Sequence, residues 1–151
     1  MSYNPDKDRK LANETTLLDQ EYTLPDRQVI KIGRERFQAA ECMFNPMLAG
    51  VEDVGFAQKV YECISACEID LFIPLIQNII LTGGTTMFPG LSSRMYSELE
   101  QVLTAQKYKG DSSRVKKTGM LIYDPPRRKH NVFIGASFLA KAAPIDQWIS
   151  K

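Results

Sequence analysis

The sequence is poor in the residues that most often build metal sites and nucleophilic catalytic sites. It holds one histidine, His130, and three cysteines, two of them four residues apart. This set matches no common zinc pattern, so we expect no structural zinc site. No Ser/His/Asp, Cys/His or paired-carboxylate arrangement is recognisable. These absences predict no metal site and no catalytic residues in this chain.

Long hydrophobic runs and an excess of one charge are also lacking. No apolar run approaches the roughly 18 residues of a membrane-spanning helix, and the polar stretch 1–9 does not resemble a signal peptide. A net charge of +1 provides no bulk attraction to nucleic acid or to a membrane surface. We therefore expect a cytoplasmic chain without membrane insertion, in a reducing compartment where Cys42, Cys63 and Cys67 are free and buried.

What the sequence does contain is centred on one stretch, residues 78–91. Ile79 to Leu81 is a short apolar run, typical of a strand buried on both faces. Gly83 and Gly84 end this run, and Pro89 suits the first turn of a following helix. Glycines at such a turn let the backbone approach a ligand closely, and a helix N-terminus favours anionic groups. A glycine pair alone, however, more often makes an ordinary turn.

Several other segments carry periodic or turn signals. Pro25-Asp26-Arg27 predicts a turn between two short strands, at 21–24 and 28–32. Residues 39–44 predict a short helix, 47–55 a loop, and Asp70 the cap of a short helix before the central strand. Two apolar stripes at helical spacing predict longer helices, one formed by Phe56, Val60, Ile64 and Cys67, the other by Leu91, Met95, Leu99, Val102 and Leu103.

The last third of the chain alternates between polar and apolar segments. Residues 105–119 are polar and basic, which is typical of a solvated surface loop, and 120–123 predict a strand. Residues 132–143 are apolar on nearly every side of a predicted helix. Because such a helix must be buried and the sequence offers little to cover it, we expect that part of the fold lies outside this chain.

Two motifs carry a family resemblance. Residues 81–91 read Leu-Thr-Gly-Gly-Thr-Thr-Met-Phe-Pro-Gly-Leu, which resembles the adenosine-binding loop of the actin family. Residues 22–37 resemble that family's β-hairpin, except that Arg27 stands where the family has glycine. The resemblance runs from about residue 11 to 151. It implies an α/β fold that is the C-terminal half of the actin/Hsp70-like, ribonuclease H-like ATPase fold.

The resemblance also implies a division of the chain and a ligand site. Residues 1–38 would be the remnant of a small subdomain with a β-hairpin, 39–129 a large C-terminal subdomain carrying the adenosine loop, and 130–151 an apolar helix returning to the other half of the fold. ATP would be the cofactor, with magnesium in a longer parent protein that would hydrolyse ATP slowly. Because the family's phosphate-clamping and metal-orienting residues belong to its other half, the resemblance implies that this chain itself is not an enzyme. Its implied contacts are Gly83 and Gly84 near ribose and phosphate, Met87 and Phe88 at adenine, and Lys129 closing over the base.

Two further features resemble one branch of the family. The basic segment containing Lys109-Gly110-Asp111 and the run at 124–130 are similar to the actin-related subunit of the complex that nucleates branched actin filaments. That implies a cytoskeletal subunit with an actin-like surface, with the other subunits and actin filaments as partners. A conventional actin, another actin-related protein, a sugar-kinase or chaperone-type ATPase, and a truncated product remain alternatives. Near-neutral charge and the lack of interleaved aromatic residues argue against nucleic-acid binding.

Overall fold

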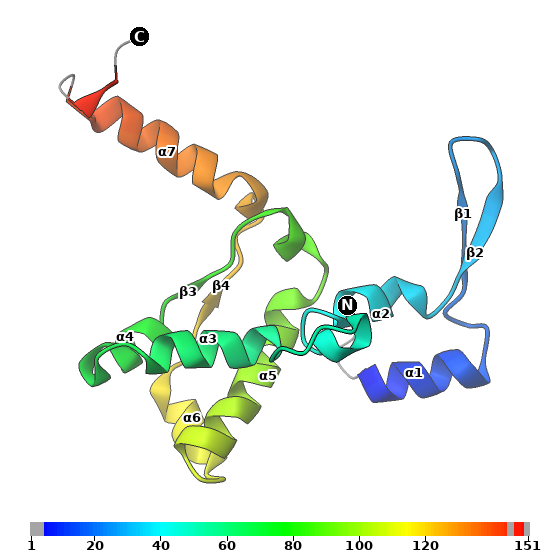
Figure 1. Ribbon diagram of the computed structural model, residues 1–151, viewed down its shortest axis with the longest axis horizontal. Helices are drawn as coiled ribbons and strands as arrows, with labels where there is room; N and C mark the ends of the chain where they lie inside the picture. Colours follow the sequence, from blue (N-terminus) through cyan, green and yellow to red (C-terminus); the bar gives the residue numbers. More distant parts are fainter. Residues whose placement is uncertain (1–4, 145–146, 150–151) are drawn as a thin grey trace.

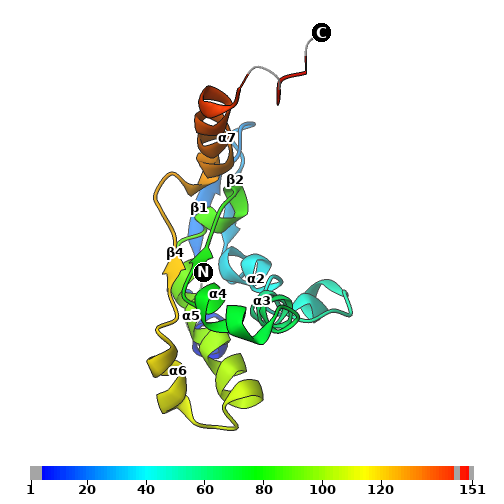
Figure 2. The same cartoon turned by 90° about the vertical axis from the view of Figure 1, so that its left-hand side faces the viewer.

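The computed structural model describes residues 5–144 and 147–149, which form helices and a few short strands (Figures 1 and 2). This mixture agrees with the predicted α/β class. The α-helices and β-strands are α1 (Pro5–Glu14), β1 (Gln20–Thr23), β2 (Val29–Ile32), α2 (Glu35–Glu41), α3 (Phe56–Ser65), α4 (Phe72–Ile76), β3 (Ile79–Ile80), α5 (Leu91–Val102), α6 (Ser112–Thr118), β4 (Ile122–Tyr123) and α7 (Asn131–Ala142). Short 3-10 or π turns connect them: η1 (Pro46–Ala49), η2 (Ile69–Leu71), η3 (Gly84–Met87), η4 (Leu103–Lys107) and η5 (Arg128–His130).

The core lies where α3, α4 and α5 meet the small sheet of β3 and β4. The predicted stripe on α5 is confirmed, because Leu91, Met95 and Leu99 are buried and Leu103 continues the same face beyond the helix end. Met95, Leu99 and Leu103 belong to one core cluster with apolar groups of the neighbouring elements, namely Ala57, Ile64, Phe72, Ile76, Val115 and Met120. The core therefore holds the strand that leads into the glycine turn.

The predicted hairpin is present, and its turn contains a strained residue. β1 and β2 pair antiparallel with Tyr22 opposite Ile30. Arg27 has a φ of +67°, in the left-handed region that favours glycine. Its backbone N–H still donates to the carbonyl of Leu24, and Asp26 accepts from the N–H of Gln28. Arginine thus adopts a conformation that a glycine would adopt without strain.

The central strand differs from its prediction in its burial. β3 pairs parallel with β4, with Ile79 opposite Ile122. Leu81 is buried, but the side chain of Ile80 is 64% exposed, so the strand is covered on one face only. The reason is that no described element packs against the outer face of this two-stranded sheet. Pro89 also lies outside the following helix, because Gly90, with a left-handed φ of +79°, is the N-cap of α5.

The basic segment 105–119 is not the solvated loop that its composition predicts. It contains α6, which begins after Asp111, whose side chain accepts a hydrogen bond from the N–H of Ser113. Gly119, at a φ of +68°, follows the last turn. Val115 is 1% exposed and anchors this helix to the core. One apolar residue among many cations was too weak a signal to predict a helix that tertiary packing stabilises.

Two smaller predictions are also wrong. Asp70 caps no helix, because it lies inside η2, and α4 begins after Leu71 without a side-chain cap. The three cysteines are free, as expected, but Cys63 and Cys67 are exposed and Cys42 is half-buried. Cys67 lies just beyond the last turn of α3, so its side chain leaves the buried stripe.

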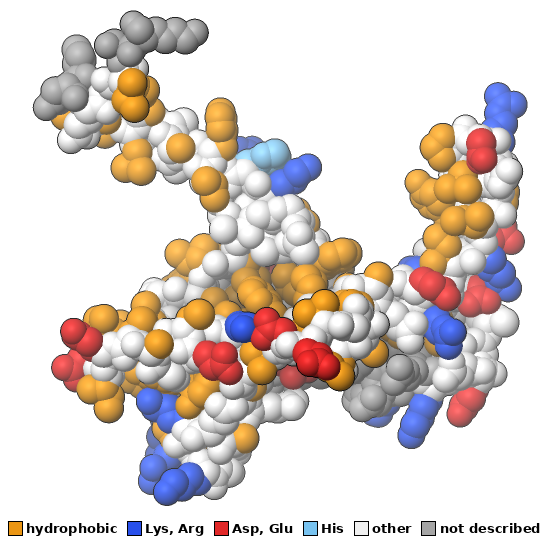
Figure 3. All heavy atoms as spheres, viewed as in Figure 1, with side chains coloured by type: hydrophobic (Ala, Val, Ile, Leu, Met, Phe, Trp, Pro, Cys, Tyr) orange, Lys and Arg blue, Asp and Glu red, His pale blue; other side chains and the backbone are white. Residues whose placement is uncertain are grey.

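α7 extends away from the rest of the molecule (Figure 1). The prediction that this helix is buried is not met within the described chain, because Val132, Phe133, Phe138 and Leu139 are all at least 70% exposed. Figure 3 shows hydrophobic side chains along this helix. Among the described residues, no helix is long and apolar enough to cross a membrane. The predicted division into 1–38, 39–129 and 130–151 stays a prediction.

Candidate functional site

The glycine turn leaves the central sheet in a conformation that suits glycine. The N–H of Leu81 donates to the carbonyl of Tyr123 at 2.9 Å, which extends the pairing of β3 with β4 by one residue. Gly83 then adopts φ +95° and ψ 163°, a region that is nearly closed to other residues. A Cβ added to Gly83 or Gly84 would meet no atom within 4 Å. The two glycines therefore leave open space in front of the backbone.

Beyond the glycines, a single turn presents both polar and apolar groups. η3 is held by Thr86, whose hydroxyl and N–H both donate to the carbonyl of Gly83, at 2.7 and 3.2 Å. Within the described residues, the N–H groups of Gly84 and Thr85 donate no hydrogen bond. The side chains of Met87 and Phe88 are about two fifths exposed, at 39% and 43%. Free N–H groups can bind an anion and exposed apolar faces can cover a base.

The second side of the site comes from η5. The carbonyl of Arg128 accepts hydrogen bonds from the N–H of Gly83 at 3.0 Å and from the hydroxyl of Thr82 at 3.1 Å. Lys129 follows directly and is exposed. The structure thus brings Lys129 beside the glycine turn although 46 residues separate it from Gly83. The N–H of Gly83 is already used in this contact, which leaves Gly84 as the better donor to a ligand.

Sequence reasoning missed Arg128 as a contact of this turn. Its guanidinium is half-buried and donates to the carbonyl of Thr86 through Nε at 3.0 Å and Nη2 at 2.8 Å. Nη1 donates to the carbonyl of Asp124 at 3.0 Å and, at 3.4 Å, to that of Pro125. No local pattern in the sequence distinguishes Arg128 from Arg127.

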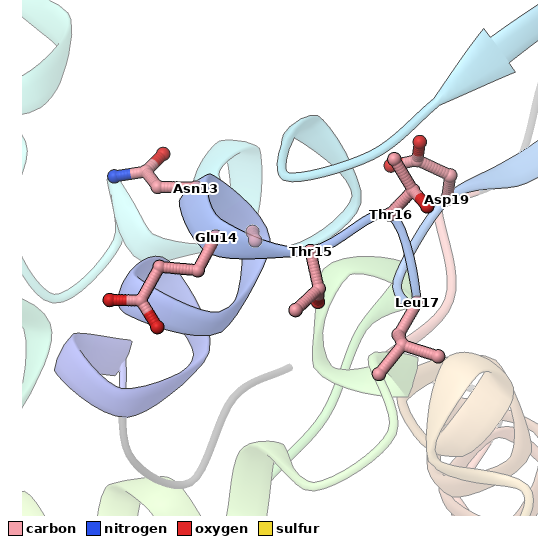
Figure 4. Close-up of a pocket in the computed structure, with 7 residues that line it drawn as sticks. Asn13, Glu14, Thr15, Thr16, Leu17 and Asp19 are labelled. Carbon is pink, nitrogen blue, oxygen red and sulfur yellow. The ribbon is translucent and has the colours of Figure 1, made fainter.

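Other hollows adjoin this site or lie apart from it. One of about 400 Å³ adjoins η3 through Thr85 and Thr86 and has a mostly apolar lining, to which Phe56 contributes. A polar hollow of about 440 Å³ follows α1 (Figure 4). In Figure 4 the carboxylates of Glu14 and Asp19 point in different directions. Consistent with this, no group of three His, Cys, Asp or Glu side chains that could hold a metal ion occurs among the described residues.

A comparison with protein families matches the chain to the actin family model over residues 1–151. Three curated relatives are named actin-related protein 2. The protein of Saccharomyces cerevisiae is 44% identical over 100% of this chain, that of Acanthamoeba castellanii 45% identical over 93%, and that of Caenorhabditis briggsae 42% identical over 100%. The aligned regions cover 39%, 36% and 39% of those relatives, so the chain spans about two fifths of their length.

This comparison corrects one prediction. The chain was expected not to be an enzyme, but the family that it matches consists of ATPases. The expectation rests on the lack of acid–base and nucleophilic residues and on the resemblance, which puts the family's phosphate-clamping and metal-orienting residues in its other half. The lack of acid–base and nucleophilic residues does not exclude ATPase activity, because phosphoryl transfer depends on positioning and charge neutralisation, with little chemistry for protein side chains to perform. Matched along its whole length and more than 40% identical to its curated relatives, the chain belongs to the actin family.

Proposed function

We propose that this chain contributes the adenosine-binding side of an ATP site in an actin-related subunit of the complex that nucleates branched actin filaments. The observation that carries the proposal is the joining of η3 and η5, which places Gly84, Met87 and Phe88 beside the segment bearing Lys129. These groups suit a purine nucleotide: open backbone near a sugar, apolar side chains for a base, and one cation. Proteins of the actin family bind nucleotide, which supports the choice of ligand.

Different residues of the chain fit different parts of ATP. Met87 and Phe88 offer exposed apolar surface to an adenine ring. Gly83 and Gly84 leave space for a ribose, since a Cβ at either position would project into open space. The N–H groups of Gly84 and Thr85 can donate hydrogen bonds to a phosphate group of ATP near the start of η3. Bound ATP, accompanied by magnesium, would act as a conformational cofactor that favours one arrangement of the fold.

The partners and location follow from the same assignment. An actin-related subunit of the branching complex would contact the other subunits and actin filaments, in the cytoskeleton. The resemblance to proteins named actin-related protein 2 supports this branch of the family over conventional actin. The exposed apolar side chains of α7 offer a surface that such assembly could cover.

The test compares two lysines that differ only in their position. Lys129→Ala should weaken binding of a fluorescent ATP analogue by about tenfold, because Lys129 lies at the proposed base pocket. Lys116→Ala removes the same charge from an exposed position on α6 and should leave the affinity unchanged. Both variants are assayed in the complex purified with its other subunits. Equal losses from the two substitutions would show that net positive charge, and no specific site, determines binding.

A further inference from the structure

Arg128 contacts the glycine turn with its backbone and with its side chain. Its carbonyl accepts from Gly83 and Thr82, while its guanidinium donates twice to the carbonyl of Thr86. The same guanidinium donates to the carbonyls of Asp124 and Pro125, in the segment that follows β4. We name this set of hydrogen bonds the Arg128 clamp. It joins both ends of the η3 turn to the segment that carries Lys129.

The clamp depends on the shape of the arginine side chain. A guanidinium presents its donors in a rigid plane, so Nε and Nη2 can bind one carbonyl while Nη1 binds others. Hydrogen bonds from a charged donor are also stronger than those between neutral groups. A lysine would bring one compact charge on a flexible stem and could not reproduce all of these contacts together. Arg127, the preceding residue, is exposed and provides a matched basic side chain for comparison.

We propose that Arg128 is a positioning residue that sets the spacing between the apolar side chains of η3 and Lys129, and thereby determines how well the site holds an adenine base. This rests on the proposed nucleotide site. Met87 lies next to Thr86 in the chain, and Lys129 lies next to Arg128, so each Arg128–Thr86 hydrogen bond constrains the two sides of the base pocket. The clamp contacts the anion-binding side of the turn only through the backbone of Gly83, whereas its hydrogen bonds to Thr86 directly fix the spacing between Met87 and Lys129. Loss of the clamp should therefore weaken base binding much more than phosphate binding.

The experiment separates these two contributions in the complex purified with its other subunits. Affinities for ATP and for inorganic tripolyphosphate, which has no base, are measured by competition with a fluorescent ATP analogue. Arg128→Met should weaken ATP binding by about tenfold and change tripolyphosphate binding by less than about twofold. Arg128→Lys should lose nearly as much as Arg128→Met, because the planar fork is what matters. Arg127→Met should behave as the unmodified protein does.

A second, milder variant distinguishes a loss of positioning from misfolding of the protein. Thr82→Val removes only the hydrogen bond from the Thr82 hydroxyl to the Arg128 carbonyl, and Thr82 is exposed. It should weaken ATP binding in the same direction by about two- to threefold, again without affecting tripolyphosphate. Equal losses for ATP and tripolyphosphate in the Arg128 variants, or unchanged ATP affinity, would overturn the positioning role. If Lys129→Ala leaves ATP affinity unchanged, the proposed site itself is wrong, which is a distinguishable result.

Discussion

Arg94 shows how a single charged residue can hold distant elements together. Its side chain is 5% exposed and forms ion pairs with Glu41 of α2 at 2.6 Å and Glu98 of α5 at 2.7 Å. Its guanidinium also lies over the ring of Phe44, 5.0 Å from the ring centre. A buried charge is tolerated only when its partners compensate it. Arg94 therefore couples the hairpin-bearing N-terminal region to the helix that follows the glycine turn.

Arg94→Met should lower the free energy of unfolding by about 3 to 5 kcal/mol, because it leaves two carboxylates without their buried partner. Lys31→Met serves as the control, since its ion pair with Asp19 is largely solvent-exposed and should contribute less than about 1 kcal/mol. Urea denaturation followed by circular dichroism measures both. A loss for Arg94→Met no larger than that for Lys31→Met would contradict a structural role for the buried cluster.

At the scale of an element, α6 depends on a carboxylate cap and a single buried valine. The pKa of Asp111 is lowered from its usual value, mainly because the Ser113 hydroxyl donates a hydrogen bond to its carboxylate. The backbone N–H groups of Ser113 and Arg114 lower this pKa further. A group with a lowered pKa in the folded state stabilises the fold above its unfolded pKa, and this contribution is lost as the pH falls through the folded value. The cap should therefore weaken in acid.

We predict that α6 frays as the pH falls below about 4, where an ordinary aspartate becomes protonated. The ¹³Cα chemical shifts of residues 112–118, followed by NMR during an acid titration, report the helix directly. Asp111→Asn keeps an oxygen acceptor at the cap but cannot titrate, so its α6 shifts should stay constant over the same range. Identical acid titrations in the two proteins would show that another carboxylate controls this helix.

For the whole molecule, the unusual feature is an exposed apolar helix. Phe133 is 77% and Phe138 is 70% exposed on α7, which extends away from the core (Figures 1 and 3). Fully burying a large apolar side chain contributes about 1.5 to 3 kcal/mol, so a surface with several of them favours association. The chain alone should consequently self-associate or bind a partner through α7.

Replacing Phe133 and Phe138 together by serine should increase the monomeric fraction of the isolated chain and reduce its binding of a hydrophobic dye. The change should alter stability by less than about 1 kcal/mol, because neither side chain is in the core. Size-exclusion chromatography with light scattering measures the first effect and dye fluorescence the second. Ile64→Ser, a substitution in the core, provides the contrast, because it should unfold the chain and raise dye binding. Continued association of the double variant would place the contact elsewhere.

The sequence by itself determined the features that depend on neighbouring residues. The hairpin around Pro25-Asp26, the α5 stripe and the glycine turn all follow from turn chemistry and side-chain periodicity. The string at 81–91 identified the family and, within the proposed site, Gly83, Gly84, Met87 and Phe88. Lys129 could be included only by resemblance, since nothing local separates it from the other cations nearby.

Only the tertiary structure decided which residues of ordinary local sequence become structural contacts. Arg128 is half-buried because its guanidinium binds the carbonyl of Thr86, 42 residues away, and Arg94 is buried because Glu41, 53 residues away, pairs with it. Val115 likewise packs in the core and thereby stabilises a helix within a basic stretch. Local patterns encode which face of an element is apolar or where a turn forms. They do not encode which distant segment arrives to accept a hydrogen bond or exclude water, and that is what gives each of these residues its role.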